Sequence, residues 1–316
     1  MPDSLPGTHR RGARDRTPQR PALRRLIGGS ALAGLMVITS SVGLTASASS
    51  AHPATGAFHE RAVVFVADTY HNRVVAVRGQ GNGVHETVSD RLDLPNGVAV
   101  DEHGTVYVAD TRNNRVVRVT PDGKQTLAVT GLSSPYGVAL GRQGDLYVAD
   151  TGNHRVLKVD RNGEKTVFAS GFDSPTGAVV DRNGDVYIAD PYNYRVVRVP
   201  SDGSPERVIP VPGLADPTSL ALDGRGHLIV ADPYNSQVLK VPVRGGTAVT
   251  VGKGLKFPTG VATDTAGNVY IADFNRNEVI KVPAGGGPQH TIPGDWFAPY
   301  GLAVSPSPLS GSGLGH

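Results

Sequence analysis

The sequence predicts an all-β protein built as a closed ring of similar four-stranded sheets. Three observations lead to this expectation. One sequence unit recurs six times, its copies are rich in β-branched and aromatic residues, and the chain of 316 residues holds 40 glycines and 24 prolines. That composition favours many turns between short strands, and no stretch shows sustained helical periodicity. Together these features predict a six-bladed β-propeller.

The repeat is clearest in six short segments that each end in an aspartate. They read like Val-Tyr-Val-Ala-Asp and recur at intervals of 40 to 42 residues. The six segments are residues 64–68, 106–110, 146–150, 186–190, 228–232 and 269–273. A period of this length with β-branched and aromatic residues is typical of a four-stranded propeller blade.

One unit illustrates how four strands follow from the residues. Small apolar residues 137–140 suit an innermost strand, and Arg-Gln-Gly-Asp at 142–145 forms a turn before the second strand, 146–149. The loop 150–154 then leads to a third strand, 155–159. A turn containing Gly163 precedes the outer strand, 165–169.

The two ends of the repeat region complement each other. The first unit starts directly at its second strand, 63–67, whereas the last complete unit is followed by Pro-Tyr-Gly-Leu-Ala-Val at 299–304. This final segment supplies the missing innermost strand. We therefore expect the ring to be closed by pairing of the N- and C-terminal strands, which removes an exposed sheet edge. The propeller is expected to span residues 63–304.

The remaining segments have a different character. Residues 1–51 combine an arginine-rich stretch, an apolar stretch at 26–44 and a run of small residues, which is the layout of a secretory signal peptide. The pair Arg24-Arg25 is compatible with twin-arginine as well as general secretory export. Cleavage after Ala48 or Ala51 and retention as an anchor are both open. Residues 52–62 form a linker and 305–316 a flexible tail in this interpretation.

Removal of a signal peptide would change the net charge of the protein. The whole chain carries +3, but residues 1–51 contain seven arginines and two aspartates, so the rest carries about −2. We therefore expect a secreted, extracellular or cell-envelope protein with no nucleic-acid partner and no stable membrane span after cleavage. The chain has no cysteine, which excludes disulfides and thiolate sites. We expect a monomer.

The pattern Pro-x-Gly-Val-Ala-Val-Asp, a glycine turn, Val-Tyr-Val-Ala-Asp-Thr and Asn-x-Arg-Val resembles the NHL repeat over residues 63–304. The resemblance extends to extracellular sensor domains of bacterial receptor serine/threonine kinases and, more distantly, to streptogramin lyases and gluconolactonase-type propellers. It implies one of two functions. The first is a binding or sensing module for a peptide, glycan or small molecule. The alternative is a channel-site lyase or lactone hydrolase that uses a divalent metal.

Ligands of propellers commonly bind on the face that carries the loops before the first strand and between the second and third strands. The expected innermost positions are the middle residues of the six Pro-x-Gly-like segments, in one of which Ser219 replaces the glycine: Asn96, Tyr136, Thr176, Thr218, Thr259 and Tyr300. Outside them we expect Tyr192, Tyr234, His71 and His154. Tyrosine rings offer stacking area, and amides and hydroxyls offer hydrogen bonds. Asparagines in these loops are equally explained as turn residues.

The six repeated aspartates suggest a structural role, with an exception in the last two units. In four units an arginine follows five residues later, a spacing that predicts an ion pair across a hairpin. In the last two units the arginine is replaced by Gln237 and Glu278. A cation such as Ca²⁺ or Mg²⁺ could then be held by Asp232, Asp273 and Glu278. Solvent exposure without a ligand is the other interpretation, and no cofactor is certain from the sequence.

Overall fold

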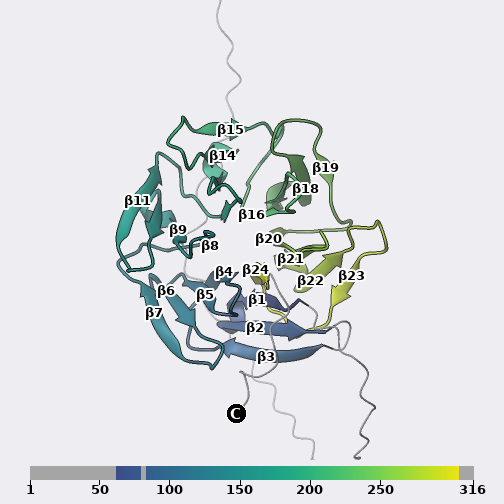
Figure 1. Cartoon of the computed structure of the whole chain (residues 1–316). Coiled ribbons are helices and arrows are strands. Elements are labelled where there is room, and N and C mark those ends of the chain that lie inside the picture. Colours follow the sequence, from purple (N-terminus) through teal and green to yellow (C-terminus); the bar gives the residue numbers. More distant parts are fainter. Residues whose placement is uncertain (1–61, 80–82, 306–316) are drawn as a thin grey trace, which may run out of the picture. The chain divides into compact units, whose positions relative to one another are not determined.

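The computed structural model describes residues 62–79 and 83–305. Within them the chain forms six four-stranded sheets arranged around a central axis (Figure 1), which confirms the predicted six-bladed propeller. The predicted signal peptide and nearly all of the predicted linker and tail lie outside the described residues. No helix among the described residues is long and apolar enough to cross a membrane.

Each sheet contributes one strand to each of four concentric positions. The innermost strands are β24 (Pro299–Val304), β4 (Pro95–Val100), β8 (Val138–Leu140), β12 (Ala178–Val180), β16 (Ser219–Leu222) and β20 (Pro258–Thr263). The second strands are β1 (Val64–Asp68), β5 (Val106–Asp110), β9 (Leu146–Asp150), β13 (Val186–Asp190), β17 (His227–Asp232) and β21 (Val269–Asp273). The third strands are β2 (Arg73–Arg78), β6 (Arg115–Val119), β10 (Arg155–Val159), β14 (Arg195–Val199), β18 (Gln237–Pro242) and β22 (Glu278–Val282).

The outermost strands are β3 (Val84–Ser89), β7 (Gln125–Val129), β11 (Lys165–Ser170), β15 (Arg207–Ile209), β19 (Val249–Thr250) and β23 (His290–Ile292). Short 3₁₀ helices join the second and third strands in five blades: η1 (Thr69–His71), η2 (Thr151–Asn153), η3 (Pro191–Asn193), η4 (Pro233–Asn235) and η5 (Phe274–Arg276). We number the blades 1 to 6 by the order of their second strands, so that blade 1 contains β24, β1, β2 and β3.

Blade 1 contains both ends of the ring. β24 pairs antiparallel with β1, and Phe65 lies opposite Ala303 in this register. The ladder continues one residue further, because the amide of Ser305 donates to the Val63 carbonyl at 2.9 Å and its hydroxyl accepts the Val63 amide. The predicted closure is therefore confirmed, and Ser305 belongs to the ring rather than to the tail.

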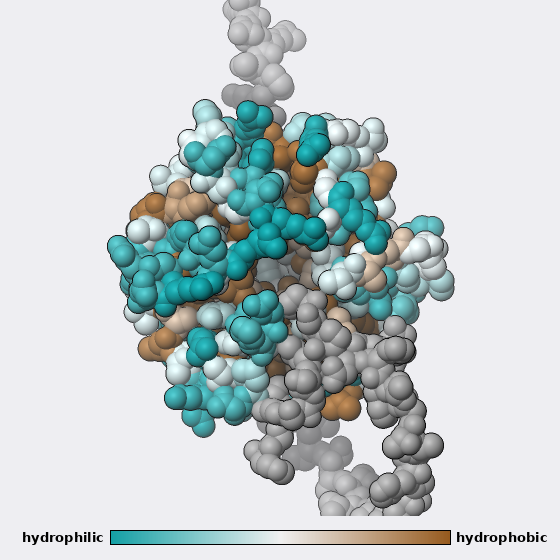
Figure 2. Space-filling model, in the orientation of Figure 1, coloured by the Kyte–Doolittle hydropathy of each residue, from teal (hydrophilic) through white to brown (hydrophobic). Residues whose placement is uncertain are grey.

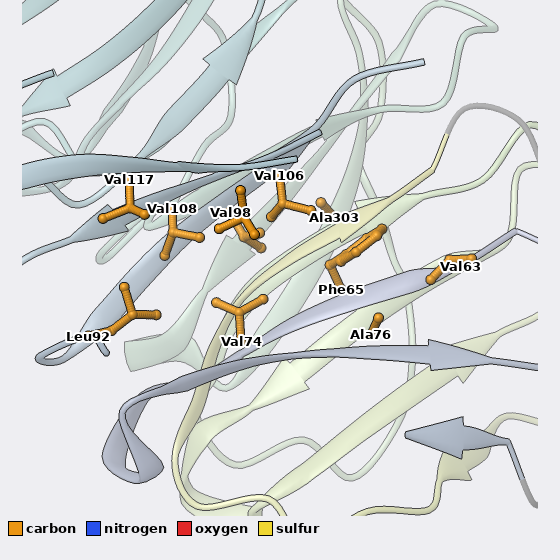
Figure 3. Packing of buried hydrophobic residues seen from close by; sticks show 11 residues of the cluster. Val63, Phe65, Val74, Ala76, Leu92, Val98, Val106, Val108, Val117 and Ala303 are labelled. Carbon is orange, nitrogen blue, oxygen red and sulfur yellow. The ribbon is translucent and has the colours of Figure 1, made fainter. Parts of the chain in front are cut away.

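The hydrophobic core lies in the seams between neighbouring blades. At the seam between blades 1 and 2, Phe65 and Ala303 pack against Val98 and Val106 (Figure 3). Phe65 is almost completely buried. The second strands are buried on both sides because each lies between two seams, which explains their continuous apolar sequence. Figure 2 shows one face of the ring, on which hydrophilic residues predominate.

Candidate functional site

The six repeated aspartates are completely buried and hold the loops of one face in place. Asp150 is representative. Its carboxylate accepts the Nε of Arg155 at 2.8 Å, the side-chain amide of Asn153 at 2.9 Å and the backbone amide of Ser133 at 2.7 Å. The ion pairs expected in blades 1 to 4 are all present, at 2.6 to 2.8 Å. These aspartates are therefore structural.

The aspartates of blades 5 and 6 have no arginine partner, and each accepts two backbone amides. Asp232 accepts the amides of Ala215 and Asp216, together with the side-chain amide of Gln237 at 3.0 Å. Asp273 accepts the amides of Lys256 and Phe257 at 2.8 and 2.9 Å. Neither carboxylate lacks hydrogen-bond donors, so the premise behind the expected cation site does not hold.

The structure does not assemble the three carboxylates into a metal site. Glu278 lies opposite Asp273 in the β21–β22 ladder, but its carboxylate pairs with the Nε of Arg276 at 2.9 Å. Asp232 belongs to blade 5 and is occupied by its own loop. Among residues 62–79 and 83–305, no group of three or more histidine, aspartate or glutamate side chains is placed to hold a metal ion.

This difference between the two kinds of aspartate is measurable. Asp150→Asn is expected to lower the free energy of unfolding by about 1.5–3 kcal/mol, because a charge-assisted hydrogen bond to Arg155 is lost. The matched Asp273→Asn change, which removes no arginine partner, should have a smaller effect. Urea unfolding of both variants tests this. Equal losses would show that the arginine contributes nothing.

The axial positions expected to bind a ligand fall into two structural classes. In blades 4 to 6 the residue is threonine, and its hydroxyl donates to a backbone carbonyl of the next blade. Thr176 donates to the Thr218 carbonyl at 3.0 Å, Thr218 donates to the Thr259 carbonyl at 3.0 Å, and Thr259 donates to the Pro299 carbonyl at 3.2 Å. Thr218 and Thr259 are buried. These three hydrogen bonds connect neighbouring blades, and we call each of them a latch.

Blades 1 to 3 make the same latch from a different residue. There a threonine directly after the buried aspartate donates to the next blade: Thr69 to the Pro95 carbonyl, Thr111 to Pro135 and Thr151 to Pro175, each at 2.7 Å. The corresponding positions of blades 4 to 6 hold Pro191, Pro233 and Phe274. Blades 1 to 3 therefore do not need a threonine at the axis, and they carry Tyr300, Asn96 and Tyr136 there.

Two of these three freed residues enter a connected group of aromatic rings. Tyr136 and Tyr300 meet edge to face with centroids 5.9 Å apart, and Tyr300 contacts Phe274 at 6.4 Å. Phe274 also contacts Tyr70 at 5.5 Å and Phe257 at 6.2 Å. We call these five residues the axial aromatic cluster. Asn96 is buried and donates to the Thr111 hydroxyl.

Two residues of the cluster, Tyr136 and Tyr300, also line an axial cavity of about 70 Å³, together with Thr176 and Thr218. Its lining contains no histidine and no acidic residue. Pockets that enclose a small organic ligand usually measure about 300–1,000 Å³. A cavity of this size takes a few waters or the tip of a side chain, so a larger partner would have to rest on the loop face.

The other predicted site residues lie on the loops of this face. Tyr192 and Tyr234 are 49% and 65% exposed. Tyr234 contacts Phe257, which joins it to the axial aromatic cluster. His71 bonds to the buried Asp68 at 2.9 Å, and His154 accepts the amide of Ser174 at 3.1 Å. Both histidines therefore have a structural partner.

Sequence reasoning missed Asp216 and Phe257, which precede the Pro-x-Gly prolines of blades 5 and 6. In the other four blades the equivalent residue has a left-handed backbone: Leu94, Ser134, Ser174 and Ala298. Its amide donates to a side chain of the preceding blade, supplied by Asn72, Asn114, His154 and Asn277 respectively.

The loops before blades 5 and 6 depart from this rule because Tyr194 and Ser236 occupy the asparagine position. The amides of Asp216 and Phe257 instead donate to the buried aspartates Asp232 and Asp273. Their backbones are not left-handed. The absence of the usual arginine in these blades signalled a real change in loop structure, although not a metal site.

Asp216 interacts electrostatically with Tyr300. Burial, with a smaller contribution from Asp232, raises the pKa of Asp216 to about 6. Burial, then the Tyr136 phenol and the Asp216 carboxylate, raise the pKa of Tyr300 well above its usual value. Among the described residues, no lysine, arginine or histidine forms an ion pair with Asp216.

Comparisons with known proteins agree with this architecture. The family model described as "NHL repeat" matches residues 92–119, 132–159, 172–198 and 255–281, which fall in blades 2, 3, 4 and 6. No curated protein sequence gives a significant match.

Several solved structures are similar in fold. A chain from the crystal structure of a nidogen/laminin complex has a TM-score of 0.70 at 21% identity, covering 78% of this chain and 99% of that one. A gluconolactonase from Xanthomonas campestris has a TM-score of 0.62 at 19% identity, covering 82% and 96%. A streptogramin B lyase has a TM-score of 0.60 at 14% identity, covering 76% and 83%. The chain is therefore a six-bladed β-propeller in which four segments match the NHL repeat, and these solved structures share its fold.

Proposed function

We propose that this protein is a secreted, monomeric binding module whose loop face, centred on the axial aromatic cluster, takes a peptide segment of a partner. The observation that carries the proposal is the connected group of rings, two of which line the axial cavity, a cavity too small to enclose an organic molecule. We call the opening of this cavity, with the six axial residues, the mouth of the propeller. Such a surface suits a partner that lies across it and inserts one side chain.

The exposed aromatics on this face support a broad contact. Tyr70, Tyr192, Tyr234 and Phe297 are each 46–65% exposed. Tyrosine and phenylalanine are enriched at protein interfaces because they offer large, rigid contact area at low conformational cost. A chain from a nidogen/laminin complex is among the similar structures, which is consistent with a binding propeller. Glycans and free small molecules are the alternative ligands.

The channel-site enzyme is the second candidate. Lyase and gluconolactonase structures among the neighbours favour it through their fold. The axial cavity opposes it, because its lining offers tyrosine, threonine, serine and asparagine side chains but no acid or histidine for acid–base chemistry or metal binding. We therefore place the binding function first.

A binding screen on peptide and glycan arrays tests the proposal. Tyr136→Ala and Tyr300→Ala are each expected to weaken peptide binding about 30-fold, equivalent to about 2 kcal/mol, as for central aromatic residues of interfaces. Leu127→Ala is the matched control, since Leu127 is exposed on the outer strand β7. Tyr136→Phe and Tyr300→Phe separate the contribution of the ring from that of the hydroxyl.

The proposal fails if no peptide is bound, or if Tyr136→Ala and Tyr300→Ala bind as the unchanged protein does. Binding confined to the glycan array would replace the peptide by a glycan. Turnover of a lactone or depsipeptide by the purified protein, lost on Tyr300→Ala, would favour the enzyme.

A further inference from the structure

We propose that the mouth of the propeller is selective for an organic cation, the side-chain ammonium of a lysine in the bound peptide, held between the axial aromatic cluster and the Asp216 carboxylate. This inference rests on the proposed peptide-binding function and specifies which side chain is inserted. Three features of the described residues support it.

The first feature is the arrangement of the rings. Tyr300 is approached edge to face by Tyr136 at 72° and by Phe274 at 86°. Tyr70 stands at 78° to Phe274, and Phe257 at 64°. The rings of the cluster thus pack on one another at steep angles, and two of them, Tyr136 and Tyr300, also line the axial cavity. An ammonium group binds to aromatic faces through the ring quadrupole. An uncharged ligand gains no such attraction.

The second feature is the position of a carboxylate without a cationic partner. Asp216 is only partly exposed and directly precedes Pro217 and Thr218, and Thr218 lines the axial cavity. None of the 14 ion pairs found in the described residues includes it. The nearby charge on Asp232 is negative, and it contributes to the raised pKa of Asp216. A ligand cation beside Asp216 would offset both the cost of burying its charge and its repulsion from Asp232.

The third feature is that the loop structure places this carboxylate there. In blades 1 to 4 the buried aspartate pairs with an arginine, whereas Asp232 accepts the Gln237 side chain at that oxygen and the Asp216 amide at its other oxygen. In blade 6 Asp273 likewise accepts the Phe257 amide, and Phe257 belongs to the axial aromatic cluster. The two loops that break the repeat therefore hold Asp216 two residues before Thr218 of the cavity lining and Phe257 within the cluster.

The size of the cavity selects the kind of cation. About 70 Å³ accommodates the end of a side chain but not a nucleobase or a sugar ring. The flexible four-carbon stem of lysine lets its compact ammonium reach such a mouth from a peptide on the surface. The planar guanidinium of arginine is larger and is expected to bind more weakly here.

The test uses the mature chain and a fluorescein-labelled peptide with one central lysine. Its comparison is the same peptide with that lysine acetylated on the ε-nitrogen, which removes the charge and keeps the stem. Fluorescence polarisation is expected to show at least about tenfold weaker binding of the acetylated peptide. Asp216→Asn should weaken binding of the lysine peptide by a similar factor and make the two peptides equivalent.

Asp173→Asn is the matched control, because Asp173 lies in the corresponding loop of blade 4 with a 55% exposed side chain. It is expected to leave binding unchanged. Proper folding of Asp216→Asn is checked by thermal unfolding. The folded-state pKa of about 6 lies above the usual value of 3.8, so the folded state loses stability as the pH rises from about 3.8 to about 6, and the full loss is present above pH 6. The asparagine variant should therefore melt at a higher temperature at pH 7 and at a similar one at pH 4.

Binding should also depend on pH. The charged group that raises the pKa of Asp216 is Asp232 at the end of β17, and Asp216 in turn raises the pKa of Tyr300 on β24. Because lysine stays charged between pH 5 and 8, protonation of Asp216 should weaken binding as the pH falls below about 6. His71 and His154 lie on the same face, and loss of this pH dependence in Asp216→Asn assigns it to the carboxylate.

Equal binding of both peptides, an unchanged affinity in Asp216→Asn, or no binding of the lysine peptide at up to about 10 mM would each overturn the inference. If other peptides still bind and Tyr136→Ala abolishes that binding, the peptide-binding function stands and only the preference for lysine fails. If Tyr136→Ala has no effect on any ligand, both proposals fail together.

Discussion

A chain that ends at Ala298 is expected to yield no stable folded monomer, whereas a chain that ends at Ser305 should unfold at the same temperature as the full protein. The shorter chain loses β24, so β1 loses the partner strand that pairs Phe65 with Ala303 and Val66 with Leu302. Its inner edge and the seam around Phe65 become open to water and to other chains. The lost stability should be comparable to the 5–15 kcal/mol that a whole domain typically has.

Size-exclusion chromatography and thermal unfolding measure this result. Dimers or larger assemblies of the truncated chain would agree with it, since an exposed edge strand pairs with another copy. A monomer as heat-resistant as the chain that ends at Ser305 would contradict closure by β24.

Gly260→Ala is expected to destabilise the ring by at least about 3 kcal/mol, at the upper end of the effects of overpacking. A Cβ atom on Gly260 would overlap the carbonyl oxygen of Tyr300 in the neighbouring blade. Backbone atoms of two innermost strands cannot move apart without loosening the latch that Thr259 makes to Pro299. The variant should therefore affect both folding and the position of the Tyr300 ring.

Urea unfolding and the NMR signals of the Tyr300 ring are the two measurements. Gly285→Ala is the control, because Gly285 has neither a left-handed backbone nor an atom within 4 Å of an added Cβ. If Gly260→Ala were as stable as this control, the close contact between innermost strands would be wrong.

The architecture follows from the sequence because all six repeats share the same spacing of strand, turn and aspartate residues. Strand order, closure by residues 299–304 and the four aspartate–arginine pairs are all confirmed, since they depend on spacing that six copies share. The identity of the axial residues was also visible. Their side-chain environments were not, because contacts between blades join residues about 24 or 42 positions apart.

The threonines show why a repeat can mislead. Thr218 and Thr259 occupy positions where ligands were expected, yet their hydroxyls donate to carbonyls of the next blade. The sequence contains the signal, because a threonine after the aspartate and a threonine at the axis never occur together in one blade: blades 1 to 3 have the first and blades 4 to 6 the second. Comparing two positions, not one, would have predicted the latch.

Asp216 could not be assigned from its residue type, since acidic residues before proline are common in turns. Its relevance arises from Tyr194, which stands where asparagine stands in blade 1 and so sends the Asp216 amide to Asp232. Asp232 and Asp273 are exceptions to the aspartate–arginine pairing, as Gln237 and Glu278 in the sequence indicate. Gln237 replaces the missing arginine at Asp232, and each of the two aspartates accepts a second backbone amide, a donor that sequence comparison does not reveal.

The division of the latches between two positions has a consequence for how such proteins diversify. In blades 1 to 3 the fastening lies in the loop, at Thr69, Thr111 and Thr151, so the axial positions 300, 96 and 136 can accept other side chains while the ring stays fastened. The three axial threonines of blades 4 to 6 are therefore needed to hold the ring together, whereas the three axial residues of blades 1 to 3 are free to vary. New specificities are most readily acquired, in nature or in the laboratory, on the half of the mouth that includes Tyr136 and Tyr300.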